Sequence, residues 1–144
     1  MKLSQQGIDL LIDREALKLK AYKDTKGIWT IGVGHTGPDV YEGLVITKEK
    51  AHELFRKDVQ WAEDAANLVL IDLTQHQFDA LVSFIFNIGV TAWKNSTMFR
   101  MLNAGDIIGA GEQFDRWRFP PEVLSRRMGE KAQFMGTEYK ARIK

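Results

Sequence analysis

Residues 15–35, EALKLKAYKDTKGIWTIGVGH, decide the fold of the first part of the chain. Over residues 17–35 the side-chain pattern has a period close to two, which is typical of β-strands. The sequence Asp-Thr-Lys-Gly at 24–27 interrupts this pattern with residues that favour a turn. We therefore expect a β-hairpin. Its second strand, over residues 28–35, has one face of mostly small residues, so we expect an open face centred on Thr30.

A short helix is expected just before the hairpin. Its stripe follows the helical spacing i, i+3, i+4 and i+7 through Ile8, Leu11, Ile12 and Glu15. Ser4 is suited to cap the first turn of this helix. Glu15 then lies on the buried face, whereas Asp24 lies in an exposed turn. Burial favours a protonated carboxyl group and exposure favours a carboxylate, so we expect the two acids to differ in protonation.

Glu15, Asp24 and Thr30 form a candidate catalytic trio, with spacings of nine and six residues. Two carboxyl groups in opposite protonation states are what glycoside hydrolysis needs. One protonates the leaving oxygen, and the other serves the opposite face of the sugar. The same residues also fit a plainer interpretation, in which Glu15 is a structural ion-pair partner and Asp24 an ordinary turn residue. Spacing and context leave both interpretations open.

The rest of the chain has mostly helical patterns. After a loop over residues 36–43, Thr47 begins an apolar repeat at three and four residues that predicts a helix of about 20 residues. A capping box at residues 74–77 predicts a second helix, which ends at Gly89. Shorter helices are expected at about 93–103, 107–117 and 122–135.

The predicted fold class is therefore α+β, mainly α, in a single domain over residues 1–144. A small N-terminal lobe at about 13–58 contains the β-hairpin. A helical lobe combines residues about 1–12 with about 68–144. A long helix at about 47–68 connects the two lobes, and we expect a cleft between them, because ligands often bind in such clefts.

Composition excludes several classes of function. The chain has 20 basic and 19 acidic residues and a net charge of +1, which argues against a dedicated nucleic-acid binder. It contains no cysteine, so disulfides, a thiol nucleophile and a cysteine-ligated zinc are excluded. No secretory signal or transmembrane segment is expected, since no apolar run has the required length.

Two motifs that bind ligands in other proteins are not expected to do so here. Residues 32–37 match the dinucleotide pattern G-x-G-x-x-G, but Pro38 and Asp39 follow it instead of a helix that would receive the phosphate. His35, His76 and Glu53 lack metal-ligand spacing. We therefore predict no metal and no cofactor.

Residues 15–35 closely resemble the signature of the phage lysozymes, the endolysins of glycoside hydrolase family 24. The resemblance covers about residues 4–135. It continues in order through 45–51, 73–81, 86–89, 95–97, 102–105 and Arg126-Arg127. It implies a lysozyme-like fold and hydrolysis of the β-1,4 bond between N-acetylmuramic acid and N-acetylglucosamine in peptidoglycan.

The resemblance also implies roles for individual residues. Glu15 matches the general acid, Asp24 the carboxylate that positions or activates water, and Thr30 the hydroxyl that helps to hold that water. Such a reaction inverts the anomeric centre and requires the two carboxyl groups to lie about 6.5–9.5 Å apart. No cofactor is implied.

Supporting and substrate-binding positions are implied as well. His35 and Asp58 match a pair that we expect to be ionic, with a raised histidine pKa. Arg126 matches an arginine that reaches the catalytic glutamate. Phe86, Asn87 and Ser96 match positions that face the cleft. An aromatic residue at helical spacing is as often plain core, so the packing interpretation of Phe86 stays open.

The chain departs from the family pattern in two places. Ala16 stands where the family commonly has glycine, which puts the local backbone beside Glu15 in question, and Arg14 precedes this pair. Residues 118–122 replace a longer loop that contains glycine, and this change affects one expected wall of the cleft.

The expected partner is peptidoglycan, and the expected state is a monomer. Residues 126–144 carry six basic and two acidic residues, so this C-terminal stretch is a candidate for electrostatic contact with an anionic cell envelope. We expect the protein to stay in the host cytoplasm until a separate pore releases it to the periplasmic cell wall.

The resemblance implies a muramidase that lyses the host cell, and two other functions compete with this expectation. One is a peptidoglycan-binding protein with weakened catalysis. The other is a lytic transglycosylase, which forms an anhydro sugar and does not need Asp24 and Thr30 to hold water.

Overall fold

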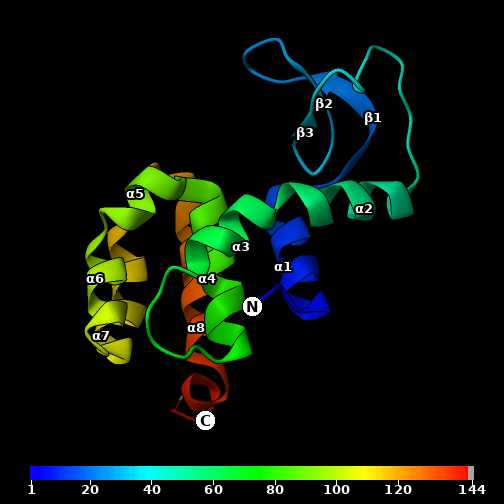
Figure 1. Ribbon diagram of the computed structural model, residues 1–144. Helices are drawn as coiled ribbons and strands as arrows, with labels where there is room; N and C mark the ends of the chain where they lie inside the picture. The colour runs from blue at the N-terminus through cyan, green and yellow to red at the C-terminus, as the bar shows by residue number, and fades with distance from the viewer. Residues whose placement is uncertain (143–144) are drawn as a thin grey trace. The chain divides into compact units, whose positions relative to one another are not determined.

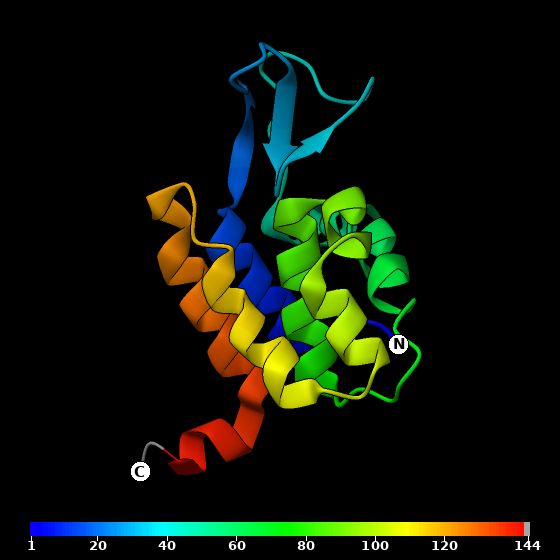
Figure 2. The ribbon, with the colours of Figure 1, turned by 90° about the vertical axis from the view of Figure 1, so that its left-hand side faces the viewer.

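The protein is mostly helical and has one small antiparallel sheet (Figures 1 and 2). The computed structural model describes the backbone of residues 1–142 and the side chains of residues 1–136. Contacts divide the chain into two units. One, the sheet unit, contains residues 9–60, and the other, the helical unit, contains residues 1–8 and the chain from Trp61 onward. The predicted α+β, mainly helical fold class is confirmed.

The sheet has the order β1-β2-β3, and both strand pairs are antiparallel. Its strands are β1 (Lys18–Lys23), β2 (Trp29–Gly32) and β3 (His35–Thr36). A small apolar core of Ala21, Ile31 and Val40 supports this sheet. The predicted hairpin is therefore present as β1 and β2.

The second strand ends earlier than the alternation predicts. Gly32 and Gly34 have φ values of 66° and 74°, a backbone conformation that turns the chain before His35. His35 therefore belongs to a third strand, β3, instead of extending β2. The predicted open face at Thr30 is also wrong, since Thr30 is 4% exposed. The reason is that β2 is the central strand, and Thr30 pairs with Tyr22 on one side and Thr36 on the other.

Helix α1 (Gln5–Glu15) begins at the predicted cap. The Gly7 amide donates a hydrogen bond to Ser4 Oγ at 3.0 Å. Asp79 accepts from the Ser4 amide at 3.1 Å and from its hydroxyl, so the cap is itself held in place. At the other end, Ala16 has φ of 71°, and it is the one residue other than glycine in the described chain with a positive φ. The positive φ explains why the phage lysozymes that the sequence resembles commonly have glycine at this position, because glycine adopts it without a clash of Cβ.

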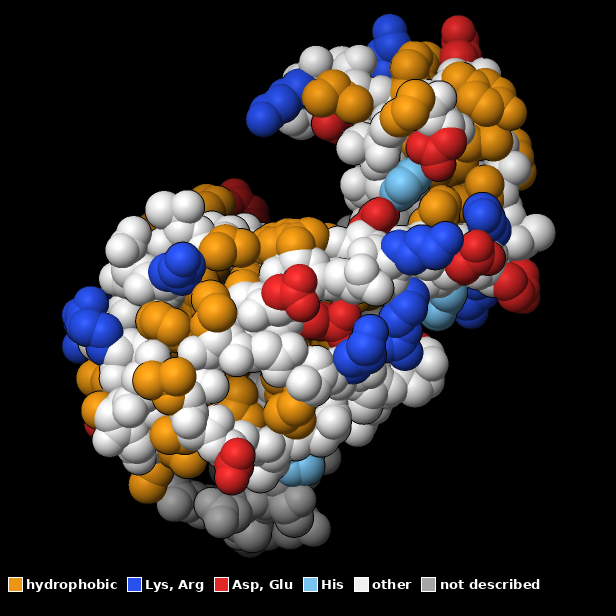
Figure 3. Space-filling model, viewed as in Figure 1, with side chains coloured by type: hydrophobic (Ala, Val, Ile, Leu, Met, Phe, Trp, Pro, Cys, Tyr) orange, Lys and Arg blue, Asp and Glu red, His pale blue; other side chains and the backbone are white. Residues whose placement is uncertain are grey.

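The predicted long helix at about 47–68 is two helices, α2 (Lys48–Asp58) and α3 (Gln60–Ala66), which meet at Val59. The side chain of Thr47 caps α2 by accepting from the Lys50 amide. Acidic and basic side chains alternate over the surface of α2, in keeping with the small net charge of the chain (Figure 3).

The helical unit is built around α4 (Gln75–Ile88) and α8 (Leu124–Arg142), which pack along each other (Figures 1 and 2). Thr74 and Gln77 form the predicted capping box of α4. The other helices are α5 (Val90–Lys94), α6 (Thr97–Asn103), α7 (Ile107–Glu112) and the 3-10 helices η1 (Gln113–Arg116) and η2 (Pro121–Val123). None of the described helices is long and apolar enough to cross a membrane.

Aromatic rings fill the core of the helical unit. Phe84 of α4 makes edge contacts with Trp93, Phe114 and Trp117, with centroid distances of 6.5, 5.3 and 5.5 Å. These contacts hold α5, η1 and the residue that follows η1, Trp117, against α4.

The backbone of Ala16 yields a stability prediction. Replacing Ala16 by glycine is expected to raise the free energy of unfolding by about 0.5–1 kcal/mol, because glycine adopts a positive φ without the Cβ clash. Urea denaturation of the two proteins measures this difference.

Ala104→Gly is the matched control, since Ala104 lies just after α6 with φ of −87°. This variant is expected to lose stability. A loss of stability in Ala16→Gly as well would contradict the proposed strain at that residue.

Candidate active site

The candidate catalytic residues all lie in the sheet unit, on consecutive elements of the chain. Glu15 is the last residue of α1, Asp24 directly follows β1, and Thr30 lies within β2. Each side chain is therefore placed by the end of a regular element or by a strand, not by a long loop. The predicted separation of the two carboxyl groups stays a prediction.

Asp24 holds the turn of the hairpin with one carboxylate oxygen. Its Oδ1 accepts hydrogen bonds from the amides of Lys26 at 2.8 Å and Ile28 at 2.9 Å. The backbone of Asp24 closes the same turn, donating to Ile28 O and accepting from the Gly27 amide, both at 2.9 Å. Among the residues that the structure describes, Oδ2 makes no hydrogen bond. These bonds fit an ordinary turn aspartate and also leave the second oxygen accessible to another partner, so both interpretations of Asp24 stay open.

Thr30 has a hydroxyl with a defined direction. Its Oγ1 donates to the carbonyl oxygen of Ile28 at 2.9 Å. A hydroxyl has one proton to donate, so the remaining capacity of Thr30 is as an acceptor. Ile28 therefore links the two candidates, since its amide binds Asp24 and its carbonyl binds Thr30.

Glu15, which the apolar stripe places on the buried face of the helix, is half-buried. It occupies the last turn of α1, and the left-handed residue Ala16 directly follows it. The chain therefore leaves the helix immediately after Glu15, and only Ala16 and Leu17 lie between this residue and the start of β1 at Lys18.

His35 lies between two carboxylates. Its Nδ1 is 2.6 Å from Asp58 Oδ2, and its Nε2 is 2.9 Å from Asp39 Oδ2. Burial lowers the pKa of His35, but the hydrogen bonds to Asp58 and Asp39 outweigh it, and the pKa is raised above 6.5. The hydrogen bond from His35 lowers the pKa of Asp39. The pairing with Asp58 is the one that the resemblance implies, whereas Asp39 was missed, although its i+4 spacing from His35 is visible in the sequence.

The predicted substrate-binding residues of the helical unit have different surroundings. Phe86 is half-buried and stacks on Trp61, with a centroid distance of 5.6 Å and an angle of 23°. Asn87 is exposed. Ser96 is 4% exposed, and its hydroxyl caps α6 by accepting from the Phe99 amide at 3.1 Å. Phe86 therefore has a packing role, and Trp61, which is 42% exposed, is an aromatic surface that sequence reasoning missed.

Ser96 also lines a pocket of about 610 Å³ within the helical unit. Its lining joins the start of α6 to η1 and comprises Asn95, Ser96, Thr97, Gln113, Arg116 and Trp117. Most of these side chains are polar, so the pocket suits a ligand with several hydrogen-bonding groups.

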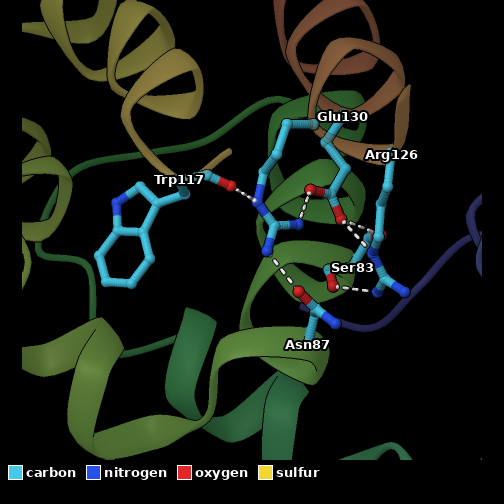
Figure 4. A network of polar contacts seen from close by, with 6 residues as sticks. Ser83, Asn87, Trp117, Arg126 and Glu130 are labelled. Carbon is cyan, nitrogen blue, oxygen red and sulfur yellow. Dashed lines mark hydrogen bonds and ion pairs between the residues drawn. The ribbon is translucent and has the colours of Figure 1, made fainter. Parts of the chain in front are cut away.

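Arg126 belongs to a buried network on α8 and α4 (Figure 4). It donates to Ser83 O at 2.7 Å and to Glu130 Oε2 at 3.1 Å. The predicted contact of Arg126 with Glu15 stays a prediction. Glu130 and Arg127 were missed as members of this network, although the spacing of Arg126, Arg127 and Glu130 on one helix is a local signal for ion pairs.

Two other predictions concern metals and the C-terminal stretch. Within the described residues, no group of three or more metal-binding side chains occurs. In the basic stretch over 126–144, the side chains of residues 137–144 lie outside the described residues.

Comparison with known proteins identifies the family. Residues 13–130 match the model of the phage lysozyme family. The chain is 45% identical to the endolysin of Salmonella phage P22, over 94% of this chain and 99% of that protein. The protein belongs to the phage lysozyme family.

Solved structures agree with this assignment. A crystal structure of a P22 lysozyme mutant has a TM-score of 0.89 at 43% identity and covers 94% of this chain and 99% of its own. The muramidase domain of SpmX from Asticaccaulis excentricus has a TM-score of 0.84 at 38% identity, with coverage of 93% and 97%. The predicted family, lysozyme-like fold and enzyme class are confirmed. As a family member, the protein is a glycoside hydrolase that degrades peptidoglycan in lysis of the host cell.

The His35 ion pairs yield a prediction for stability against pH. Because the folded pKa is raised, the stabilisation by His35 is fully present below pH 6.5 and is lost as pH rises through the folded pKa. Replacing His35 by glutamine is therefore expected to cost more unfolding free energy at about pH 5.5 than at about pH 8.5.

Chemical denaturation of both proteins at the two pH values measures this difference. Asp58→Asn, which removes one of the two carboxylates, is expected to reduce the pH dependence in the otherwise native chain. A cost of His35→Gln that is the same at both pH values would contradict the account.

Proposed function

We propose that this lysozyme cleaves the β-1,4 bond between N-acetylmuramic acid and N-acetylglucosamine with inversion at the anomeric carbon. Glu15 is the general acid, Asp24 the general base, and Thr30 positions the attacking water. The observation that carries this proposal is the divided use of the Asp24 carboxylate, with Oδ1 bound by two backbone amides and Oδ2 left for another ligand.

The hydrogen-bond directions suit activation of a water molecule. Thr30 gives its proton to Ile28 O, so toward water it is an acceptor. Asp24 Oδ2 is an acceptor as well. A water that donates one proton to each group directs a lone pair away from both, toward the anomeric carbon. Asp24 then takes a proton as the water attacks.

Glu15 supplies the proton to the leaving oxygen. Its half-buried place at the end of α1 limits contact with water while leaving part of the carboxyl group accessible. In an inverting reaction the two carboxyl groups stand far enough apart for the sugar and the water to lie between them. We propose that Arg126 orients Glu15. We also propose that the ion pair of His35 and Asp58 holds β3, the strand that contains His35, in place.

The helical unit supplies contacts to the glycan. Trp61, stacked on Phe86, offers an apolar ring surface to a sugar, and Asn87 offers a side-chain amide. Since the Ser96 hydroxyl caps α6, Ser96 contributes through its place in the wall of the polar pocket.

We further propose that the protein acts as a monomer on the host cell wall, after release from the cytoplasm through a separate pore. The basic stretch over residues 126–144 adds electrostatic attraction to the anionic envelope. The competing functions are peptidoglycan binding with weakened catalysis, which differs from this proposal in turnover, and lytic transglycosylation, which differs in product.

Clearing of outer-membrane-permeabilised Gram-negative cells tests the assigned acid. The native protein is expected to reduce turbidity, and Glu15→Gln, which has nearly the same shape but cannot donate the proton, is expected to be about 10²- to 10⁴-fold slower. Equal clearing by both would reject Glu15 as the acid. No clearing by a folded native protein would favour the binding function.

A pair of Asp24 variants separates catalysis from folding. Asp24→Asn keeps an oxygen for the Lys26 and Ile28 amides, so its melting temperature is expected to stay close to native while clearing falls about 10²- to 10⁴-fold. Asp24→Ala also removes the turn contacts and is expected to lower the melting temperature. Native-like clearing by a folded Asp24→Asn protein would contradict the role of Asp24.

A further inference from the structure

Glu130 lies at the centre of a buried charged cluster on α8. Its side chain is fully buried, and Oε1 accepts from Arg127 Nη1 at 2.7 Å. Oε2 accepts from Arg126 Nε at 3.1 Å and from the Ser83 hydroxyl at 2.5 Å. Both carboxylate oxygens are therefore bound. Removing one partner would leave a buried charge unpaired, so the cluster holds its members in one arrangement.

Arg127 connects this buried cluster to an exposed side chain, Asn87. Only 3% of the residue is exposed, yet its guanidinium group reaches three separate partners. Besides Glu130, Nε donates to Trp117 O at 2.9 Å, and Nη2 donates to Asn87 Oδ1. The group also lies 5.0 Å from the ring centroid of Phe84. A planar group with fixed donor directions thus positions Asn87 by one contact and Trp117 by another.

The consequence for Asn87 follows from donor chemistry. Arginine has donors only, so Asn87 must turn its oxygen toward Arg127, which directs the amide nitrogen away from it. Figure 4 shows the Asn87 oxygen on the side of the network and the nitrogen on the opposite side. Asn87 is exposed, and within the described residues its nitrogen donates to no partner. Toward a ligand, Asn87 is therefore a donor of hydrogen bonds.

We propose that Arg127 and Glu130 are positioning residues that direct the amide nitrogen of Asn87 to donate to a carbonyl oxygen of the peptidoglycan substrate. This inference rests on the proposed function, because it assigns Asn87 to the substrate. The ligand chemistry is an amide carbonyl oxygen, which peptidoglycan carries both in its N-acetyl groups and in its stem peptides. The buried ion cluster thus determines which hydrogen-bonding groups the surface of the helical unit can recognise.

Asn87→Asp separates ligand binding from the contact with Arg127. The new carboxylate still accepts from Arg127, so the melting temperature is expected to be native-like or higher. It has no N–H to donate, so the dissociation constant for substrate is expected to rise about three- to tenfold, in keeping with loss of one hydrogen bond. Binding is measured in the Glu15→Gln background with soluble glycan chains, prepared with and without stem peptides.

The two preparations distinguish the two sources of the carbonyl. Weaker binding of both indicates an N-acetyl group, and weaker binding of only the peptide-bearing chains indicates a stem peptide. Asn103→Asp is the matched control, since Asn103 Oδ1 also accepts a bond, from the Leu70 amide at 2.8 Å, and the charge change is the same. Unchanged binding of both preparations by Asn87→Asp would overturn the proposal.

A double-mutant cycle tests the positioning role of Arg127. Arg127→Lys keeps the charge but cannot reach three partners, so KM for the glycan is expected to rise with little change in kcat. In the Asn87→Ala background the same substitution is expected to leave KM unchanged, because Arg127 acts through Asn87. A KM increase of equal size in both backgrounds would contradict the role. If Arg127→Lys does not fold, Glu130→Gln, which keeps an oxygen that can accept from Arg127 but removes the charge that holds it, takes its place in the same cycle with the same expected and contradicting outcomes.

These readouts remain separate from the test of the proposed function. The binding experiment needs no turnover, whereas cell clearing by the native protein does. Clearing without an effect of Asn87→Asp on binding rejects the positioning proposal alone. Failure of the folded native protein to clear cells rejects the proposed function.

Discussion

The turn at residues 24–28 is the constraint on which the sheet unit and the proposed chemistry both depend. Asp24 closes it through its backbone and through one carboxylate oxygen, which fixes the start of β2 relative to the end of β1. The same bonds orient the second oxygen. Ile28 extends this control to Thr30, whose hydroxyl donates to the Ile28 carbonyl. The proposed water-binding groups are therefore positioned by the hydrogen bonds that form the hairpin.

The helical unit uses a different physical means to the same end. There, the fully buried carboxylate of Glu130 binds Arg126 and Arg127. Arg127 in turn donates a hydrogen bond to the exposed side-chain amide of Asn87. A buried ion cluster adds little net stability, because desolvation of its charges offsets their attraction. The cluster instead orients the amide group of Asn87, since it determines which atom of that group faces outward. Backbone amides in one unit and ion pairs in the other thus limit the motion of polar side chains.

Much of this could be predicted from sequence where the determining contacts are local. The Ser4 cap, the capping box at Thr74 and the turn at Asp24 each depend on residues within four positions, and the structure contains all three. The burial of Thr30 could not be predicted, because it depends on the third strand, His35–Thr36, which follows a turn at two glycines with positive φ. The contact between Asn87 and Arg127 spans 40 residues and requires α4 and α8 to pack first. Long-range contacts of this kind leave no periodic signal.

In the proposed mechanism, Asp24 and Thr30 hold a water that attacks opposite the leaving group. The most direct test is proton NMR of the new reducing ends during the first minutes of peptidoglycan digestion, before mutarotation equilibrates them. Inversion of a β-linked substrate predicts that the α-anomer forms first. Initial formation of the β-anomer would indicate retention through a covalent intermediate, and 1,6-anhydro ends would indicate transglycosylation. Either result would contradict the account.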